Sequence, residues 1–102
     1  MKPKILNKIK DDKYIMYLYT FNGGKKVTFF EIYINEFKDE NKELLENYLN
    51  SVNSSGYKIT DNNKEKPNFQ EGKNFKHSIK FILWSKDVRK IYDNIKNILN
   101  SL

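Results

Sequence analysis

The chain has 102 residues, a formal net charge of +6, 15% aromatic residues, one histidine and no cysteine. This length fits a single domain over residues 1–102, and the lack of cysteine excludes disulfides, thiolate metal sites and cysteine nucleophiles. The longest apolar run, residues 81–84, is far shorter than the ~20 residues that cross a membrane. We therefore expect a cytoplasmic protein with no membrane partner, no metal and no cofactor.

The N-terminal third predicts a short leading segment followed by a β-hairpin. Residues 3–10 carry a few apolar residues and are expected to form a short helix or an arm within residues 1–12. Residues 14–21 and 27–34 alternate in the manner of strands, and the sequence Asn-Gly-Gly-Lys at 22–25 lies between them. Glycine and asparagine accept the positive φ that tight hairpin turns need, so a two-stranded hairpin is predicted here.

The rest of the chain predicts a helix, two strands and a closing helix. Residues 35–52 place apolar side chains at helical spacing, and Gly56 is suited to ending that helix. The later elements are a strand over 57–60, a long basic loop over 61–73, a strand over 75–84 and a helix capped by Ser85. The order ββαββα predicts an α+β fold, with an antiparallel sheet of about four strands and two helices packed on one face.

The positive charge is unevenly distributed along the chain. Residues 35–56 contain two lysines and five acids, so the rest of the chain carries a net charge of +9. Lysine, asparagine and isoleucine are abundant in the way that an AT-rich bacterial, phage or plasmid gene favours, so codon bias explains part of the lysine excess. It does not explain why one helix is acidic, and we expect a basic side distinct from an acidic patch.

A group of lysines interleaved with rings follows the first predicted helix. Lysines neutralise phosphates and aromatic rings stack on bases, so this pattern is typical of a surface that contacts the nucleic-acid backbone. Arg89 is the single arginine, which argues against base-specific reading of a duplex. The predicted nucleic-acid-binding residues are Lys64, Lys66, Lys73, Lys76, Lys80, Phe69 and His77.

The predicted hairpin is apolar on both faces. Strand alternation is taken to place Tyr17, Tyr19, Phe21, Phe30 and Ile32 on one face of it. If the helices cover one face only, the second face needs a partner, and these five residues are the predicted protein interface. The candidates for that partner are a second copy in a homodimer, another protein, stacked bases, or a further layer of the same chain.

No pattern of catalytic residues is found, and we expect no enzyme. Glu36 and Lys38 match half of a nuclease motif but stand where a helix is predicted to begin. The leading hypothesis is a small non-enzymatic protein that binds DNA or RNA. The alternative is a protein-directed inhibitor with an acidic-surfaced target, anti-CRISPR-like or anti-restriction-like. The third is a small RNase toxin that uses His77.

Overall fold

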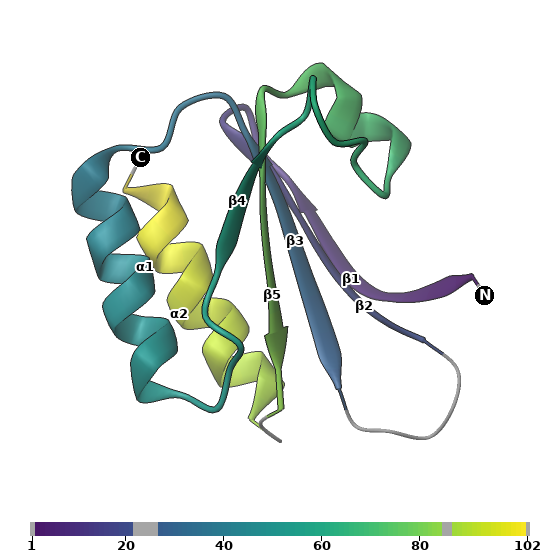
Figure 1. Ribbon diagram of the computed structural model, residues 1–102. Coiled ribbons are helices and arrows are strands. Elements are labelled where there is room, and N and C mark those ends of the chain that lie inside the picture. Colours follow the sequence, from purple (N-terminus) through teal and green to yellow (C-terminus); the bar gives the residue numbers. More distant parts are fainter. Residues whose placement is uncertain (1, 22–26, 85–86, 102) are drawn as a thin grey trace.

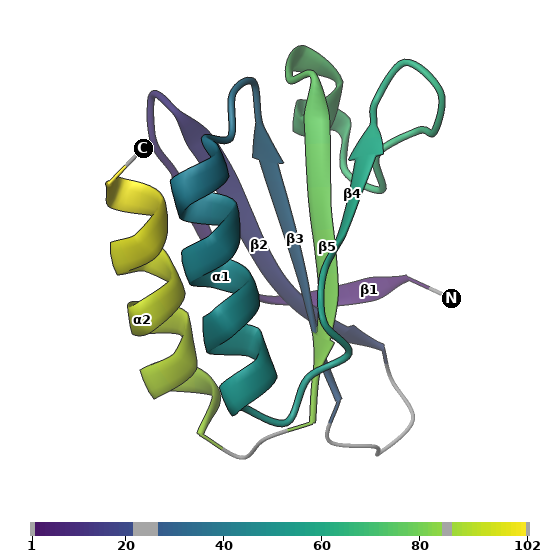
Figure 2. The same cartoon turned by 60° about the vertical axis from the view of Figure 1, so that its left-hand side comes forward.

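The computed structural model describes residues 2–21, 27–84 and 87–101. In this part of the chain, five strands form one antiparallel sheet and two helices lie side by side on one of its faces (Figures 1 and 2). The elements are β1 (Pro3–Lys10), β2 (Tyr14–Phe21), β3 (Thr28–Ile34), α1 (Asp39–Ser51), β4 (Lys58–Asp61), the 3-10 helix η1 (Gln70–Asn74), β5 (His77–Leu83) and α2 (Val88–Asn100). The predicted α+β class is confirmed.

The sheet has one strand more than predicted, and its order is β1-β2-β3-β5-β4. Residues 3–10 form the edge strand β1, so the predicted N-terminal helix is wrong. A β-bulge between Ile5 and Asn7 sets Ile5 opposite Tyr19 but Ile9 opposite Met16. The extra residue breaks the alternation and leaves apolar residues at positions 5, 6 and 9, which imitates a helical stripe.

The other elements have the predicted types with shifted ends. The first helix begins at Asp39 rather than at residue 35, with Asp39 and Glu40 in its first turn, where carboxylates favour the positive end of the helix dipole. The predicted turn at 22–25 and the predicted cap Ser85 lie outside the described residues. Among the described residues, neither helix is long and apolar enough to cross a membrane.

The main hydrophobic core lies between the helices and the sheet. Leu45 and Leu49 of α1 are buried at a spacing of four residues, as are Ile91, Ile95 and Leu99 of α2. This spacing places them on one face of each helix. The sheet meets them with side chains that are at most 3% exposed: Tyr14, Met16, Leu18, Phe30, Ile32, Ile34, Ile79, Phe81 and Leu83.

The face assignment within the hairpin was wrong by one residue. Leu18 lies opposite Phe30 and Met16 opposite Ile32, so Phe30 and Ile32 point into the helix-side core. A two-residue turn at 23–24 would instead pair odd-numbered with even-numbered residues. That register would place Tyr17 and Tyr19 on the same face as Phe30 and Ile32. A slip of one residue moves every side chain of a strand to the other face.

The face of the sheet away from the helices, here called the open face, is covered in large part by residues 62–76, the cover segment (Figure 1). Gly72 of this segment packs closely against the ring of Tyr33 and against Pro67, and Phe69 stacks on Tyr17. The Asn62 side-chain amide donates to the backbone oxygens of Gly72 (3.0 Å) and Phe75 (2.9 Å), which holds the segment in a compact loop. Most of the predicted basic loop is therefore a second layer.

Gly72 is the tightest point of this layer. A Cβ there would stand 2.6 Å from two ring carbons of Tyr33 and 2.7 Å from the Cβ of Pro67. Because Tyr33 is fully buried, we expect Gly72→Ala to lower the free energy of unfolding by about 1–3 kcal/mol, measured by urea denaturation.

Gly56→Ala is the matched control for this substitution. Gly56 has a φ of +73° but no atom within 4 Å of the added Cβ, so only backbone strain of about 1–2 kcal/mol is expected. Limited proteolysis separates the two effects. Gly72→Ala should speed cleavage within the cover segment, and Gly56→Ala should not. Equal protection of that segment in both variants would contradict the close packing.

Candidate nucleic-acid interface

A continuous run of aromatic rings crosses the open face. Tyr17 stacks on Phe69 with ring centroids 4.0 Å apart and planes 4° apart, and Tyr19 stacks on Phe29 at 5.4 Å. Edge-to-face contacts join these pairs to one another and to Phe21. The whole aromatic run comprises Phe21, Phe29, Tyr19, Phe69, Tyr17, Tyr33 and Phe75.

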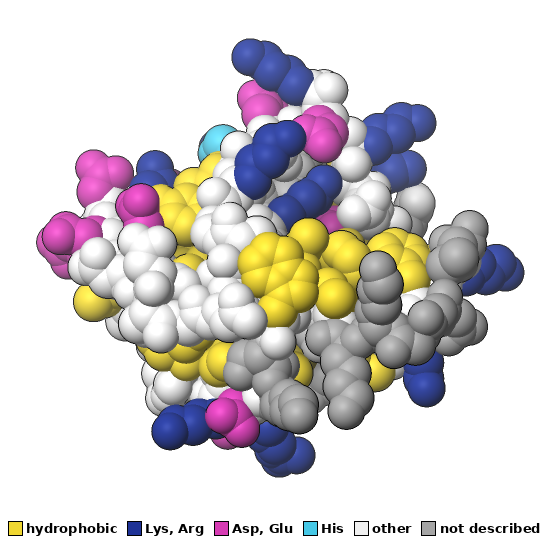
Figure 3. All heavy atoms as spheres, turned by 60° about the horizontal axis from the view of Figure 1, so that its bottom comes forward, with side chains coloured by type: hydrophobic (Ala, Val, Ile, Leu, Met, Phe, Trp, Pro, Cys, Tyr) yellow, Lys and Arg dark blue, Asp and Glu magenta, His cyan; other side chains and the backbone are white. Residues whose placement is uncertain are grey.

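The run is buried at one end and reaches solvent at the other. Tyr17, Tyr19 and Tyr33 are at most 5% exposed, because the cover segment lies over them. Phe21, at the end of β2, is 38% exposed. Trp84, just after β5, adds a ring that is 45% exposed at the same end of the sheet. Figure 3 shows apolar side chains gathered at this end of the molecule, with lysine and arginine side chains around them.

Lysines lie beside the aromatic run in one row across the sheet. The register places Lys8 beside Tyr17, Tyr17 beside Glu31, Glu31 beside Lys80 and Lys80 beside Lys58. Because directly opposed residues of antiparallel strands share a face, all three lysines belong to the open face. Lys58 and Lys80 share one carboxylate, Glu65, at 3.9 and 3.8 Å, so this pair keeps an excess positive charge.

A second carboxylate, Glu71, joins the cover segment to β1. It accepts hydrogen bonds from Lys8, from Lys10 (3.2 Å) and from the Tyr17 hydroxyl (3.1 Å). The bonds from Lys8 and Lys10 hold the pKa of Glu71 at about 2, below its ordinary value of 4.5. Lys8 also lies 5.3 Å from the centre of the Tyr17 ring, in cation–π range.

Glu31 is a fully buried carboxylate in the middle of the open face. The Tyr19 hydroxyl donates to its Oε1 at 3.1 Å, and the Tyr33 hydroxyl donates to its Oε2. Asn68 of the cover segment donates twice, from its backbone N–H (3.0 Å) and from its side-chain amide (2.7 Å). Four donors from two layers therefore satisfy one buried charge, which fixes the cover segment over the aromatic run.

The structure brings part of the predicted lysine and aromatic cluster together. Lys64, Lys66 and Lys73 are exposed on the cover segment, and Lys80 lies on the open face beneath it. Phe69 belongs to the aromatic run, although its stacking on Tyr17 occupies one side of its ring. These predicted residues therefore surround one surface.

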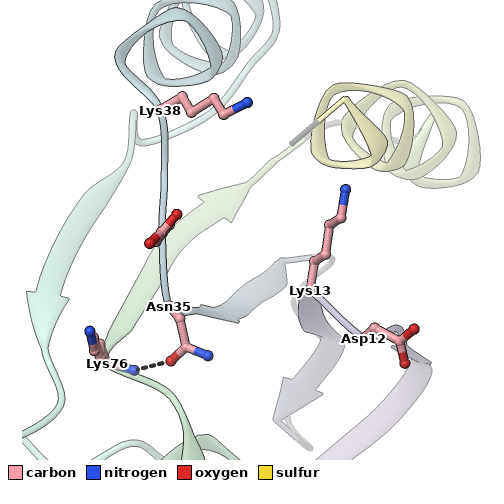
Figure 4. A pocket seen from close by; sticks show the side chains of 6 residues that line it. Asp12, Lys13, Asn35, Lys38 and Lys76 are labelled. Carbon is pink, nitrogen blue, oxygen red and sulfur yellow. Dashed lines mark hydrogen bonds between the residues drawn. The ribbon is translucent and has the colours of Figure 1, made fainter.

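His77 and Lys76 lie apart from that surface. His77 pairs with Ile34, a residue of the helix-side core, so it shares the helix side of the sheet. The Lys76 backbone N–H donates to the Asn35 side-chain oxygen at 3.0 Å. Lys76 also lines a hollow of about 570 Å³ that Figure 4 shows from close by. That hollow is lined by Asp12, Lys13, Asn35, Glu36, Lys38 and Lys76.

The five residues of the predicted protein interface do not form one surface. Phe30 and Ile32 are buried under the helices. Tyr17 and Tyr19 face the opposite way and are buried under the cover segment. Of these five residues, Phe21 alone is exposed, and it lies at the exposed end of the aromatic run.

Several residues of this surface were missed in the sequence. Phe29, Lys8 and Lys58 gain their places from strand pairing, which no local pattern reveals. The available signal for Lys8 was the pair of lysines at positions 8 and 10, because residues two apart in a strand share a face. Reading this signal requires that β1 be recognised as a strand.

Comparison of this chain with protein-family models, with curated proteins and with solved structures finds no match.

Proposed function

We propose that this chain binds single-stranded nucleic acid on the open face, at the exposed end of the aromatic run. The observation that carries the proposal is the exposed ring of Phe21, in contact with Phe29 and continuous with five further rings, on the same face of the sheet as the row of lysines that crosses it at Tyr17. Unpaired bases can stack on such rings, and each stacked base contributes about 1–3 kcal/mol. Bases inside a duplex cannot reach them.

The lysines suit contact with the phosphate backbone rather than with base edges. Lys58 and Lys80 lie in neighbouring strands on the open face, and Lys64 and Lys66 are exposed on the cover segment above them. Arg89 lies in α2, on the helix side, so the bidentate reading of guanine that arginine provides is remote from this surface. We expect weak sequence preference and strong dependence on salt.

Removing the exposed ring should weaken binding. We expect Phe21→Ala to raise the dissociation constant for fluorescent oligo-dT or oligo-U of about ten nucleotides by roughly tenfold, measured by anisotropy at low salt. Leu44→Ala is the matched control, because Leu44 is 52% exposed but lies on α1. Comparison of the two oligonucleotides shows whether DNA or RNA binds better. Equal affinities of Phe21→Ala and Leu44→Ala would contradict the stacking surface.

The lysine row is tested by a salt titration of the same complexes. Lys58→Gln with Lys80→Gln should lower the slope of log affinity against log salt by about 1–2, since each phosphate contact on a single strand contributes about 0.7. Lys96→Gln, on the exposed part of α2, should leave the slope unchanged. Weak binding at low salt, or binding that does not decline with rising salt, would contradict the proposed nucleic-acid binding.

A protein-directed inhibitor is the second candidate. Ile5 is 49% exposed and lies opposite Tyr19, so it extends the exposed aromatic end into an apolar surface that another protein could bury. A pull-down from a nuclease-treated lysate separates the candidates. Stoichiometric retention of a protein that Phe21→Ala releases favours the inhibitor, and loss of every partner favours direct nucleic-acid binding.

A further inference from the structure

The outer edge of β1 offers backbone groups for a further strand. In the described part of the chain, β1 pairs with β2 on one side only and stands at the end of the sheet (Figure 2). Seven of its eight residues are exposed. An edge strand of this length presents unpaired N–H and C=O groups, which another extended segment can bind.

A groove on the helix side lies directly beside this edge. It is lined by Leu6, Asn7, Leu18, Val88, Arg89 and Tyr92 and has a volume of about 240 Å³. Leu6, the residue displaced by the bulge, is 49% exposed, and Leu18 and Tyr92 form the buried floor. A strand added to β1 would direct alternate side chains toward the helix side, where this groove can receive an apolar one.

The positive charge along the edge of β1 favours an acidic partner over a second copy of this chain. Residues 2–10 contain four lysines and no acid, and Glu71 is the single carboxylate that pairs with any of them in the described structure. Arg89 adds a positive charge at the groove. Pairing β1 with a second copy of itself would bring six lysines into one strand pair, and opposed like charges destabilise such pairs. The bulge further blunts self-pairing.

We propose that the edge of β1 accepts an extended acidic segment of a partner protein as an additional strand. Backbone hydrogen bonds hold the segment along β1, an apolar side chain enters the groove beside Leu6, and carboxylates face Lys4 and Arg89. The proposal does not rest on nucleic-acid binding, because the groove and Lys4 lie on the helix side and the aromatic run lies on the open face.

The test uses a fluorescent, acetylated peptide of about nine residues. Its alternate positions carry glutamate, valine and glutamate in turn, so that these side chains share one face of the strand, and the positions between them carry threonine. It is compared with the same peptide carrying lysine in place of glutamate. The glutamate peptide is expected to bind about tenfold or more tightly than the lysine peptide. N-methylation of alternate residues then blocks one edge of the peptide. Because a strand uses one edge to pair, one of the two alternate N-methylated peptides should lose binding and the other should keep it.

Variants of the chain give the second readout. Lys4→Glu should weaken the glutamate peptide by about tenfold, while the exposed helix variant Lys96→Glu should not. Backbone amide signals of residues 4–10 should shift on peptide addition. The proposal is overturned if both N-methylated peptides bind alike, if neither glutamate nor lysine peptide binds, or if light scattering shows a dimer whose formation competes with the peptide.

Discussion

Replacing Glu31 with leucine is expected to lower the free energy of unfolding by about 3–5 kcal/mol, the largest effect of any single polar side chain in the described structure. The leucine fills the space but accepts no hydrogen bonds. Tyr19, Tyr33 and Asn68 would then keep buried donors without an acceptor, and each unmade bond costs about 1–3 kcal/mol. Urea denaturation followed by circular dichroism measures the loss.

The controls for this substitution separate charge, shape and burial. Glu31→Gln keeps the shape but turns one acceptor into a donor that faces other donors, so an intermediate loss is expected. Glu65→Leu removes an exposed carboxylate of the cover segment, with ion pairs longer than 3.7 Å, and should change stability by less than about 1 kcal/mol. If Glu31→Leu were as stable as Glu65→Leu, Glu31 would not anchor the cover segment.

The same network explains why the open face could be predicted only in part. The alternation in residues 14–34 correctly indicated two strands that are apolar on both faces, and the need for something to cover the second face followed from it. The cover itself could not be predicted. Phe69 and Phe75 are scattered through a polar stretch, and their rings contact Tyr17 and Tyr33, which lie more than forty positions away.

Local patterns succeeded where one element determines its own buried face. Ile91, Ile95 and Leu99 predict the buried stripe of α2 directly, because helical spacing does not depend on the partner. Strand pairing is different. The faces of β2 and β3 depend on a register set by the connection between them, and the strand character of β1 is hidden by its bulge. Both errors concern pairing rather than propensity.

The candidate surface was predictable to the same extent. The lysines on the cover segment and Phe69 lie together as their sequence positions suggested, because they belong to one loop. His77 follows that loop in sequence but is directed to the helix side of the sheet by its pairing with Ile34 in β5, and Lys76, just before β5, lines a separate hollow. A sequence cluster that crosses from a loop into a strand is divided by the alternation of the strand.

Alkaline pH is expected to unfold the chain over a narrow range above pH 10. Burial first, and the Glu31 carboxylate next, raise the pKa values of Tyr19 and Tyr33 well above the ordinary 10.0. In the unfolded chain these hydroxyls would ionise near pH 10, so the unfolded state releases protons first as the pH rises. Their contribution to stability is complete below pH 10 and is lost as the pH approaches their folded pKa values.

The measurement is the absorbance of phenolate at 295 nm beside circular dichroism at the same pH. Tyr14, Tyr17, Tyr57 and Tyr92 also have raised pKa values, mainly through burial, so phenolate should appear late and together with the loss of helix and sheet signal. Tyr19→Phe, with one hydroxyl fewer to ionise beside Glu31, should be less stable at pH 7 but should lose less of its stability between pH 9 and pH 11. Tyrosine ionisation that is complete while the fold persists would show that Glu31 is not enclosed by protonated hydroxyls.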